Sequence, residues 1–158
     1  MKPFKYKFLV IGLGNPLRGD DGLGLKVVEN LKQKKLGRGI SIIKAGTAPV
    51  NYLEEIKQAQ NIIGVDAIQG GKKPGSIYQL TLNDLNQQLS QYPTSHNYSL
   101  PQVVSLAKEI ANRPKKSFFY GIEPEELTFK PQLSSSVKQS LPQLIEKINI
   151  KIKESQHK

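Results

Sequence analysis

The chain has 158 residues, a length that suits one domain with a single buried core. It contains no cysteine, which excludes disulfides, thiolate metal sites and a cysteine nucleophile. The apolar run near its start, Phe8–Ile11, is too short for a signal segment or a membrane span. We therefore expect one cytoplasmic domain over residues 1–158, without a membrane partner.

The formal net charge is +10, from 23 basic and 13 acidic residues. Such a charge favours anionic partners in general. The lysines are nevertheless scattered in small groups, and no aromatic residues stand between them as stacking platforms for bases. The pattern predicts a solvated basic surface and no nucleic-acid partner.

The first half of the chain alternates β-prone runs with helical periodicity. Lys5–Ile11 predicts a strand that stops at glycines, and apolar residues recur at helical spacing from Leu23 onward. Ile40–Ile43 predicts a second strand. A helix should follow it, with Thr47 as its N-cap and Pro49 in its first turn.

The middle of the chain predicts a buried strand and then an exposed one. Asn61–Ile68 is almost continuously apolar, as expected of a parallel strand covered on both faces. Pro74 and Gly75 predict a turn, after which Ser76–Leu82 alternates like an edge strand. Asn83–Ser90 predicts a polar helix.

The last third predicts a helix, a strand and a final helix. Ser99 followed by Gln102 is a capping-box signature, and Ser117–Ile122 predicts the last strand. A long amphipathic helix should come next, kinked or restarted at Pro142, with Glu154–Lys158 frayed. Its apolar stripe consists of Val137, Leu141, Leu144, Ile145 and Ile148.

Strands that alternate with helices predict an α/β fold. We expect a single doubly wound, mainly parallel twisted sheet with helices on both faces, in three αβα layers. In such sheets ligands bind outside the carboxyl ends of the strands, at the topological switch point. The loops that leave those ends are therefore the places to look for a site.

The loop after the first strand, Gly12–Gly24, is rich in glycine and superficially resembles a dinucleotide fingerprint. Leu17 stands where the third fingerprint glycine should be, and Asp20 and Asp21 would repel a pyrophosphate. We interpret Asp20 as a helix N-cap. An N-cap explains only one of the two acids, so we assign Asp21 to function. Gly22 and Gly24 would let a ligand or a backbone segment approach closely.

Two further side chains are candidates for the same edge of the sheet. Asp66 ends the buried third strand, and His96 lies in the loop before the capped helix. Either one could instead be structural or solvated, since a carboxylate can bind loop amides and a lone histidine is often a surface residue. Asp21, Asp66 and His96 together suit a first-row divalent ion with open positions. The residues alone leave open a metal-assisted hydrolase or a metal-sensing site.

Several motifs, in order and at compatible spacing, resemble the nickel-iron hydrogenase maturation endopeptidases. These are Gly12-Leu13-Gly14-Asn15, Asp20-Asp21-Gly22-Leu23-Gly24, Gly46-Thr47, Asp66-Ala67, His96 and Gly121-Ile122-Glu123-Pro124. The resemblance implies the open α/β fold expected above, in one peptidase domain. It also implies a protease that removes the C-terminal extension of the hydrogenase large-subunit precursor after nickel insertion.

The resemblance further implies that Asp21, Asp66 and His96 form a catalytic, metal-binding trio. These side chains would probe nickel held by the precursor's cysteines, so nickel belongs to the substrate, and the isolated enzyme could bind another divalent metal. In this chain Lys44 precedes Ala45-Gly46-Thr47, where the family often has an acidic residue before its Gly-Thr pair. That departure bears on the choice of substrate.

Two other functions stay open at this point, and a monomer is expected in each case. Peptidyl-tRNA hydrolase shares the sequence Gly-Leu-Gly-Asn-Pro, here Gly12–Pro16, but that family has a histidine shortly after it, where this chain has Arg18 and two acids. Alternatively, the trio carries or senses nickel without cutting a peptide bond, as in a metallochaperone.

Overall fold

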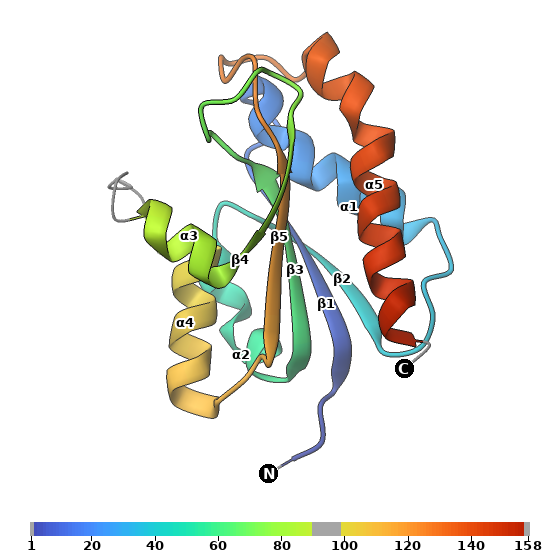
Figure 1. The fold of residues 1–158 in the computed structure, drawn as a ribbon, viewed down its shortest axis with the longest axis vertical. Coiled ribbons are helices and arrows are strands. Elements are labelled where there is room, and N and C mark those ends of the chain that lie inside the picture. Colours follow the sequence, from blue (N-terminus) through green and yellow to red (C-terminus); the bar gives the residue numbers. More distant parts are fainter. Residues whose placement is uncertain (1, 90–98, 157–158) are drawn as a thin grey trace.

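The structure is a computed structural model that describes residues 2–89 and 99–156. A five-stranded sheet lies between two layers of helices, which confirms the predicted three-layer α/β fold (Figure 1). The strand order is β2-β1-β3-β5-β4, and every pairing is parallel except that of β4 with β5. The strands are β1 (Tyr6–Leu13), β2 (Ile40–Gly46), β3 (Ala59–Ala67), β4 (Ile77–Thr81) and β5 (Lys116–Ile122).

The helices divide between the two faces of the sheet. Helices α1 and α5 cover one face, and α2, α3 and α4 cover the other (Figure 1). None of the helices in the described part of the chain is long and apolar enough to cross a membrane. Their bounds are α1 (Leu23–Lys32), α2 (Leu53–Lys57), α3 (Leu82–Leu89), α4 (Leu100–Ala111) and α5 (Ser135–Gln156), with 3₁₀ turns η1 (Gly19–Gly22) and η2 (Pro49–Tyr52).

The central strand β1 shows why the sheet is covered on both sides. Successive side chains of a strand point to opposite faces. Phe8 and Val10 pack in the core beneath α1 and α5, while Leu9 and Ile11 pack in the core beneath α2 and α4. Burial on both faces requires the continuous apolar run that the sequence has here. The exposed edge strand β4 instead alternates, with Tyr78 buried and Gln79 exposed, as predicted.

The prediction of a Thr47 N-cap was wrong. The helical segment begins with the 3₁₀ turn η2, its N-cap is Ala48, and no side chain caps it. Pro49 occupies the first turn as expected. A proline disfavours helical backbone at the residue before it, so Ala48 stays outside the turn and becomes the boundary. Thr47 lies one residue too early to cap.

The predictions of a helix restart at Pro142 and a frayed end from Glu154 were also wrong for the described residues. Helix α5 is continuous from Ser135 to Gln156 with Pro142 inside it. Its end is held by tertiary contacts: Ile152 is fully buried, and Nε2 of Gln156 donates to the carbonyl oxygen of Leu36 at 2.7 Å. These tertiary contacts outweigh the local sequence preferences that predicted a frayed helix end.

The strand order puts the topological switch point beside β1. The chain leaves β1 for β2 on one side, and β3 lies on the other side of β1. Gly12 is in register with Val65, so the β1–α1 loop starts next to the end of β3. The loops from the carboxyl ends of β1, β3 and β5 gather at the top of the view in Figure 1. This is the edge at which ligands of such sheets bind.

We expect Gly24→Ala to destabilise the fold. A β-carbon at Gly24, on α1, would overlap the carbonyl oxygens of Val65 and Leu13, which are fixed in adjacent strands. Alanine gains about 1 kcal/mol of helix propensity over glycine. Overpacking against a rigid backbone should cost more than that gain, giving a net loss of about 1–3 kcal/mol in the free energy of unfolding by urea.

Lys26→Ala, an exposed change on the same helix, is the matched control and should stay within about 0.5 kcal/mol of the parent chain. A Gly24→Ala variant as stable as the parent would show that the close helix–strand contact is not required.

Candidate functional site

The β1–α1 loop folds back so that Asp21 returns to the start of the loop. The backbone N–H of Gly14 donates to the carbonyl oxygen of Gly46 at 2.9 Å, which holds the loop against the end of β2. The N–H of Asn15 then donates to Oδ2 of Asp21 at 2.9 Å. Gly14 has a φ of +115°, a conformation that side chains rarely tolerate, so glycine is needed at this turn.

The structure brings Asp66 and Asp21 together at this loop. Asp66 lies near the end of β3, and its Oδ1 accepts a hydrogen bond from the N–H of Ala67 at 2.8 Å. A β-carbon on Gly14 would lie 3.6 Å from that Oδ1 and would overlap the carbonyl oxygen of Asp21. Gly14 therefore lies between the backbone carbonyl of Asp21 and the carboxylate of Asp66, where a side chain would not fit.

The proximity of the two acids changes the pKa of Asp66. Burial raises the pKa of this carboxyl, and the negative charge of Asp21 raises it further. The hydrogen bond from Ala67 works in the opposite direction, and the resulting pKa is about 7. A carboxyl with this pKa exchanges its proton near neutral pH, a property that is common at functional sites.

The two carboxylates retain capacity to bind a ligand. Asp21 receives its hydrogen bond on Oδ2 and Asp66 on Oδ1, and no residue in the ranges 2–89 and 99–156 donates to the other oxygen of either. The same ranges contain no group of three or more His, Cys, Asp or Glu side chains that could hold a metal ion. His96 lies outside the described residues, so its place in the trio remains a prediction.

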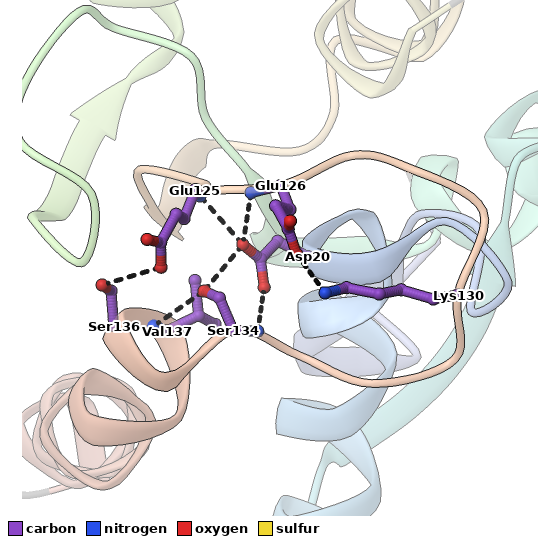
Figure 2. Close-up of polar contacts among 7 residues, drawn as sticks. All are labelled: Asp20, Glu125, Glu126, Lys130, Ser134, Ser136 and Val137. Carbon is purple, nitrogen blue, oxygen red and sulfur yellow. Dashed lines mark hydrogen bonds and ion pairs between the residues drawn. The ribbon is translucent and has the colours of Figure 1, made fainter.

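The interpretation of Asp20 as a helix cap was wrong. Its carboxylate is fully buried and makes no capping bond to η1 or α1. Oδ2 accepts hydrogen bonds from the N–H groups of Glu125 and Glu126 at 2.8 and 3.0 Å (Figure 2). Ser134 donates its N–H to Oδ1 at 2.7 Å and its hydroxyl to Oδ2 at 2.8 Å. These partners lie more than 100 residues along the chain, where local sequence patterns do not reach.

Asp20 thereby joins the β1–α1 loop to the β5–α5 loop. Two backbone bonds reinforce the joint, from the N–H of Gly19 to the carbonyl of Lys130 at 2.7 Å and from the N–H of Asp20 to the carbonyl of Glu126 at 2.9 Å. Burial alone would raise the pKa of the Asp20 carboxyl, but its hydrogen bonds outweigh burial and hold the pKa below its usual range. The residue is therefore an ionised anchor.

Glu123 is a second buried acid whose role the sequence analysis did not assign. It follows β5, and its Oε1 accepts hydrogen bonds from the N–H groups of Gly70 and Lys72 at 3.0 and 2.9 Å. The hydroxyl of Tyr78 donates to the same oxygen at 2.5 Å. Glu123 thus fixes the loop that follows Asp66. An acid directly after a buried strand, the signal that pointed to Asp66, could also have pointed to Glu123.

Lys44, which departs from the family pattern, lies near the end of β2 and is exposed. Its Nζ is 2.6 Å from Oε1 of Glu29 on α1. The hydrogen bond and charge of Lys44 hold the pKa of Glu29 below its usual range. An acidic residue at position 44 would repel Glu29, so the lysine is matched to its neighbour in this chain.

Comparison with known proteins gives consistent results. A family model described as hydrogenase maturation protease matches residues 25–150, a stretch that includes Asp66 and His96 and begins after Asp21. A protein of Methanocaldococcus jannaschii named as a hydrogenase maturation protease is 32% identical over 157 residues, covering 94% of this chain and 98% of that protein. The hydrogenase 2 maturation protease of Escherichia coli is 28% identical over 151 residues, covering 94% and 92%.

Solved structures agree with these matches. The hydrogenase maturating endopeptidase HybD from E. coli superposes with a TM-score of 0.86 at 27% identity, covering 94% of this chain and 93% of that one. The NiFe hydrogenase maturation protease HycI from Thermococcus kodakarensis gives a TM-score of 0.80 at 26% identity, covering 94% of both chains. The likeness therefore spans nearly the whole domain in both sequence and fold.

We expect Asp20→Asn to lower the free energy of unfolding at pH 7 by about 3 kcal/mol, because an amide nitrogen would face backbone N–H donors in a buried site. The stability that the Asp20 carboxylate contributes is present above the pKa of an unfolded aspartate, about 4, and is lost as pH falls through the lower folded pKa. The difference between parent and variant, measured by urea unfolding, should therefore shrink below about pH 4.

Asp21→Asn is the matched control for the neighbouring acid. Within residues 2–89 and 99–156 the Asp21 carboxylate accepts one hydrogen bond, from the N–H of Asn15, and an asparagine oxygen can also accept it. This variant should lose less than about 1 kcal/mol. An equal loss from both variants would contradict the assignment of Asp20 as the anchor.

We expect the side-chain carboxyl of Asp66, followed by ¹³C NMR, to titrate with a midpoint of about 7. Asp21→Asn should lower that midpoint, because it removes the negative charge that opposes ionisation of Asp66. Glu109→Gln, which removes one exposed carboxylate from α4, should leave the midpoint unchanged. Titration of Asp66 near pH 4 in the parent chain would contradict the electrostatic coupling.

Proposed function

The chain belongs to the hydrogenase maturation protease family, and from that premise we propose that it removes the C-terminal extension of the nickel-iron hydrogenase large-subunit precursor after nickel insertion. The family membership makes it a protease and argues against peptidyl-tRNA hydrolase. The observation that carries the finer proposal is the pair of acids Asp21 and Asp66 at the carboxyl edge of the sheet, close enough that the charge of Asp21 raises the pKa of Asp66.

Nickel enters this proposal as part of the substrate. Asp21 and Asp66 supply carboxylate oxygens, and His96 supplies an imidazole, which together are donors that a divalent first-row ion accepts. The N–H groups of Asn15 and Ala67 orient the two carboxylates and leave one oxygen of each available within the described part of the chain. A precursor without nickel would lack the group that these side chains recognise, so it would not be positioned for cleavage.

The chemistry needs a base for the attacking water. Asp66 is the candidate because, in the chain without nickel, burial and the charge of Asp21 raise its pKa to about 7, and a base is most effective when its pKa lies near the working pH. In the proposed reaction the water oxygen attacks the scissile carbonyl carbon, and a proton of that water passes to Asp66. The peptide C–N bond then breaks, and the proton is delivered to the leaving amine. Polarisation of the same water by the precursor's nickel would assist this step.

The test uses purified large-subunit precursor in nickel-loaded and nickel-free forms, with loss of the tail followed by mass spectrometry. We expect the parent chain to cut the loaded form alone. Asp21→Asn, Asp66→Asn and His96→Ala should each slow cleavage by about 100-fold or more, because each removes a group that acts on the metal or the proton. Glu109→Gln, an exposed acid on α4, should cleave at the parental rate.

Two outcomes would overturn the proposal. Full processing by any of the three site variants, with folding confirmed by circular dichroism, would remove that residue from the site. Binding of nickel or of loaded precursor by the parent chain without any loss of tail would identify a non-catalytic nickel-binding maturation factor.

A further inference from the structure

Two large apolar side chains are exposed on the loops that follow β1 and β5. Leu17 is 62% exposed and Phe129 is 84% exposed, although most large apolar side chains of the described residues are buried. Leu17 lies four positions before Asp21 in the β1–α1 loop, and Phe129 lies in the β5–α5 loop. Single exposed apolar residues are common on protein surfaces, so their significance depends on whether these two form one surface.

The two loops are joined at Arg18, which is the residue next to Leu17 and lies against Phe129. The guanidinium of Arg18, the residue after Leu17, lies 5.9 Å from the centre of the Phe129 ring. Arg18 also forms a β-bridge with Lys130, the residue after Phe129. The half-buried Arg18 therefore links the exposed ring of Phe129 to the residue that follows the exposed Leu17, and we call these three residues the Leu17–Phe129 surface.

This surface rests on a rigid base. The backbone of the β5–α5 loop is held by Asp20 through Glu125, Glu126 and Ser134, as Figure 2 shows. The base of the Leu17 side is held as well, because the N–H of Leu17 donates to Oδ1 of Asn15 at 2.9 Å. Apolar side chains on an ordered backbone lose little further freedom on binding, which favours their use as anchors in an interface.

The charge of the surface limits what can bind it. Lys130 is ion-paired with Glu126, whereas no acidic partner for Arg18 occurs among the ion pairs within residues 2–89 and 99–156. A partner that covers Phe129 would bury the Arg18 guanidinium beside it, so it should supply a carboxylate. The fitting ligand is a peptide segment with an apolar side chain next to an acidic one.

We propose that the Leu17–Phe129 surface binds the precursor segment that flanks the scissile bond, through an apolar side chain and a neighbouring carboxylate of that segment. The proposal rests on the proposed function, because the surface adjoins the loop that carries Asp21. Because Leu17 and Asp21 belong to the same loop, we infer that the residues flanking a peptide bond held at Asp21 and Asp66 lie over Leu17. The surface then fixes the substrate backbone, while the paired acids carry out the chemistry.

The test measures the affinity of the full chain for nickel-loaded precursor by titration calorimetry and, separately, the KM and kcat of tail removal. Phe129→Ala and Leu17→Ala should each weaken binding and raise KM about ten-fold while leaving kcat unchanged. Arg18→Gln should weaken binding in low salt and lose that effect in high salt. Ile110→Ala, which shortens a 56% exposed apolar residue on α4, is the control and should match the parent chain.

The outcomes separate this inference from the proposed function. Precursor that binds the parent chain but keeps its tail would refute cleavage, while a ten-fold loss of affinity in Phe129→Ala would still support the docking surface. Parental affinity and KM in Phe129→Ala and Leu17→Ala, or a fall in kcat alone, would overturn the docking surface. A change in self-association with unchanged precursor affinity would overturn it in favour of a second copy of this chain.

Discussion

The hydrogen bonding of one buried carboxylate, that of Asp20, is the constraint on which the rest of the site depends. It ties the loop after β1 to the loop after β5 through four donors supplied by Glu125, Glu126 and Ser134. The hydroxyl of Ser134 also accepts from the N–H of Val137 in the first turn of α5, so the same anchor fixes the start of that helix. Loops positioned by a rigid scaffold are suited to carry function.

Asp20 and Asp66 show how environment assigns different tasks to the same residue type. Both are desolvated, which by itself raises the pKa of a carboxyl. Four donors overcome that effect at Asp20, whereas Asp66 has one donor and faces the charge of Asp21. Asp20 therefore stays ionised and structural, while Asp66 can exchange a proton near neutral pH. Of the two adjacent acids, Asp21 is the one whose charge acts on Asp66, and Gly14 fits between the backbone of Asp21 and the carboxylate of Asp66.

The sequence was most informative about the strands, whose apolar patterns are local, and less so about helix ends. Continuous apolar runs predicted β1 and β3, alternation predicted the edge strand β4, and the position of Asp66 at a strand end placed it at the correct edge. The partners of Asp20 could not be predicted, because a helix cap and a buried anchor look alike in sequence. Phe129 gave no signal, since a single aromatic residue in a loop has no periodicity. The end of α5 depends on contacts with Leu36, far away in the chain.

The acid pair lowers the stability of the fold, and the sign of its effect follows from the raised pKa of Asp66. Between about pH 4, where an unfolded aspartate titrates, and about pH 7, the folded state binds more protons at this position than the unfolded state. The contribution of Asp66 to the free energy of unfolding therefore decreases as the pH rises from about 4 to about 7. The opposite shift at Asp20 stabilises the fold above pH 4, in the same loop. The β1–α1 loop thus keeps Asp21 beside Asp66 despite their repulsion, because Asp20, the residue before Asp21, anchors that loop strongly.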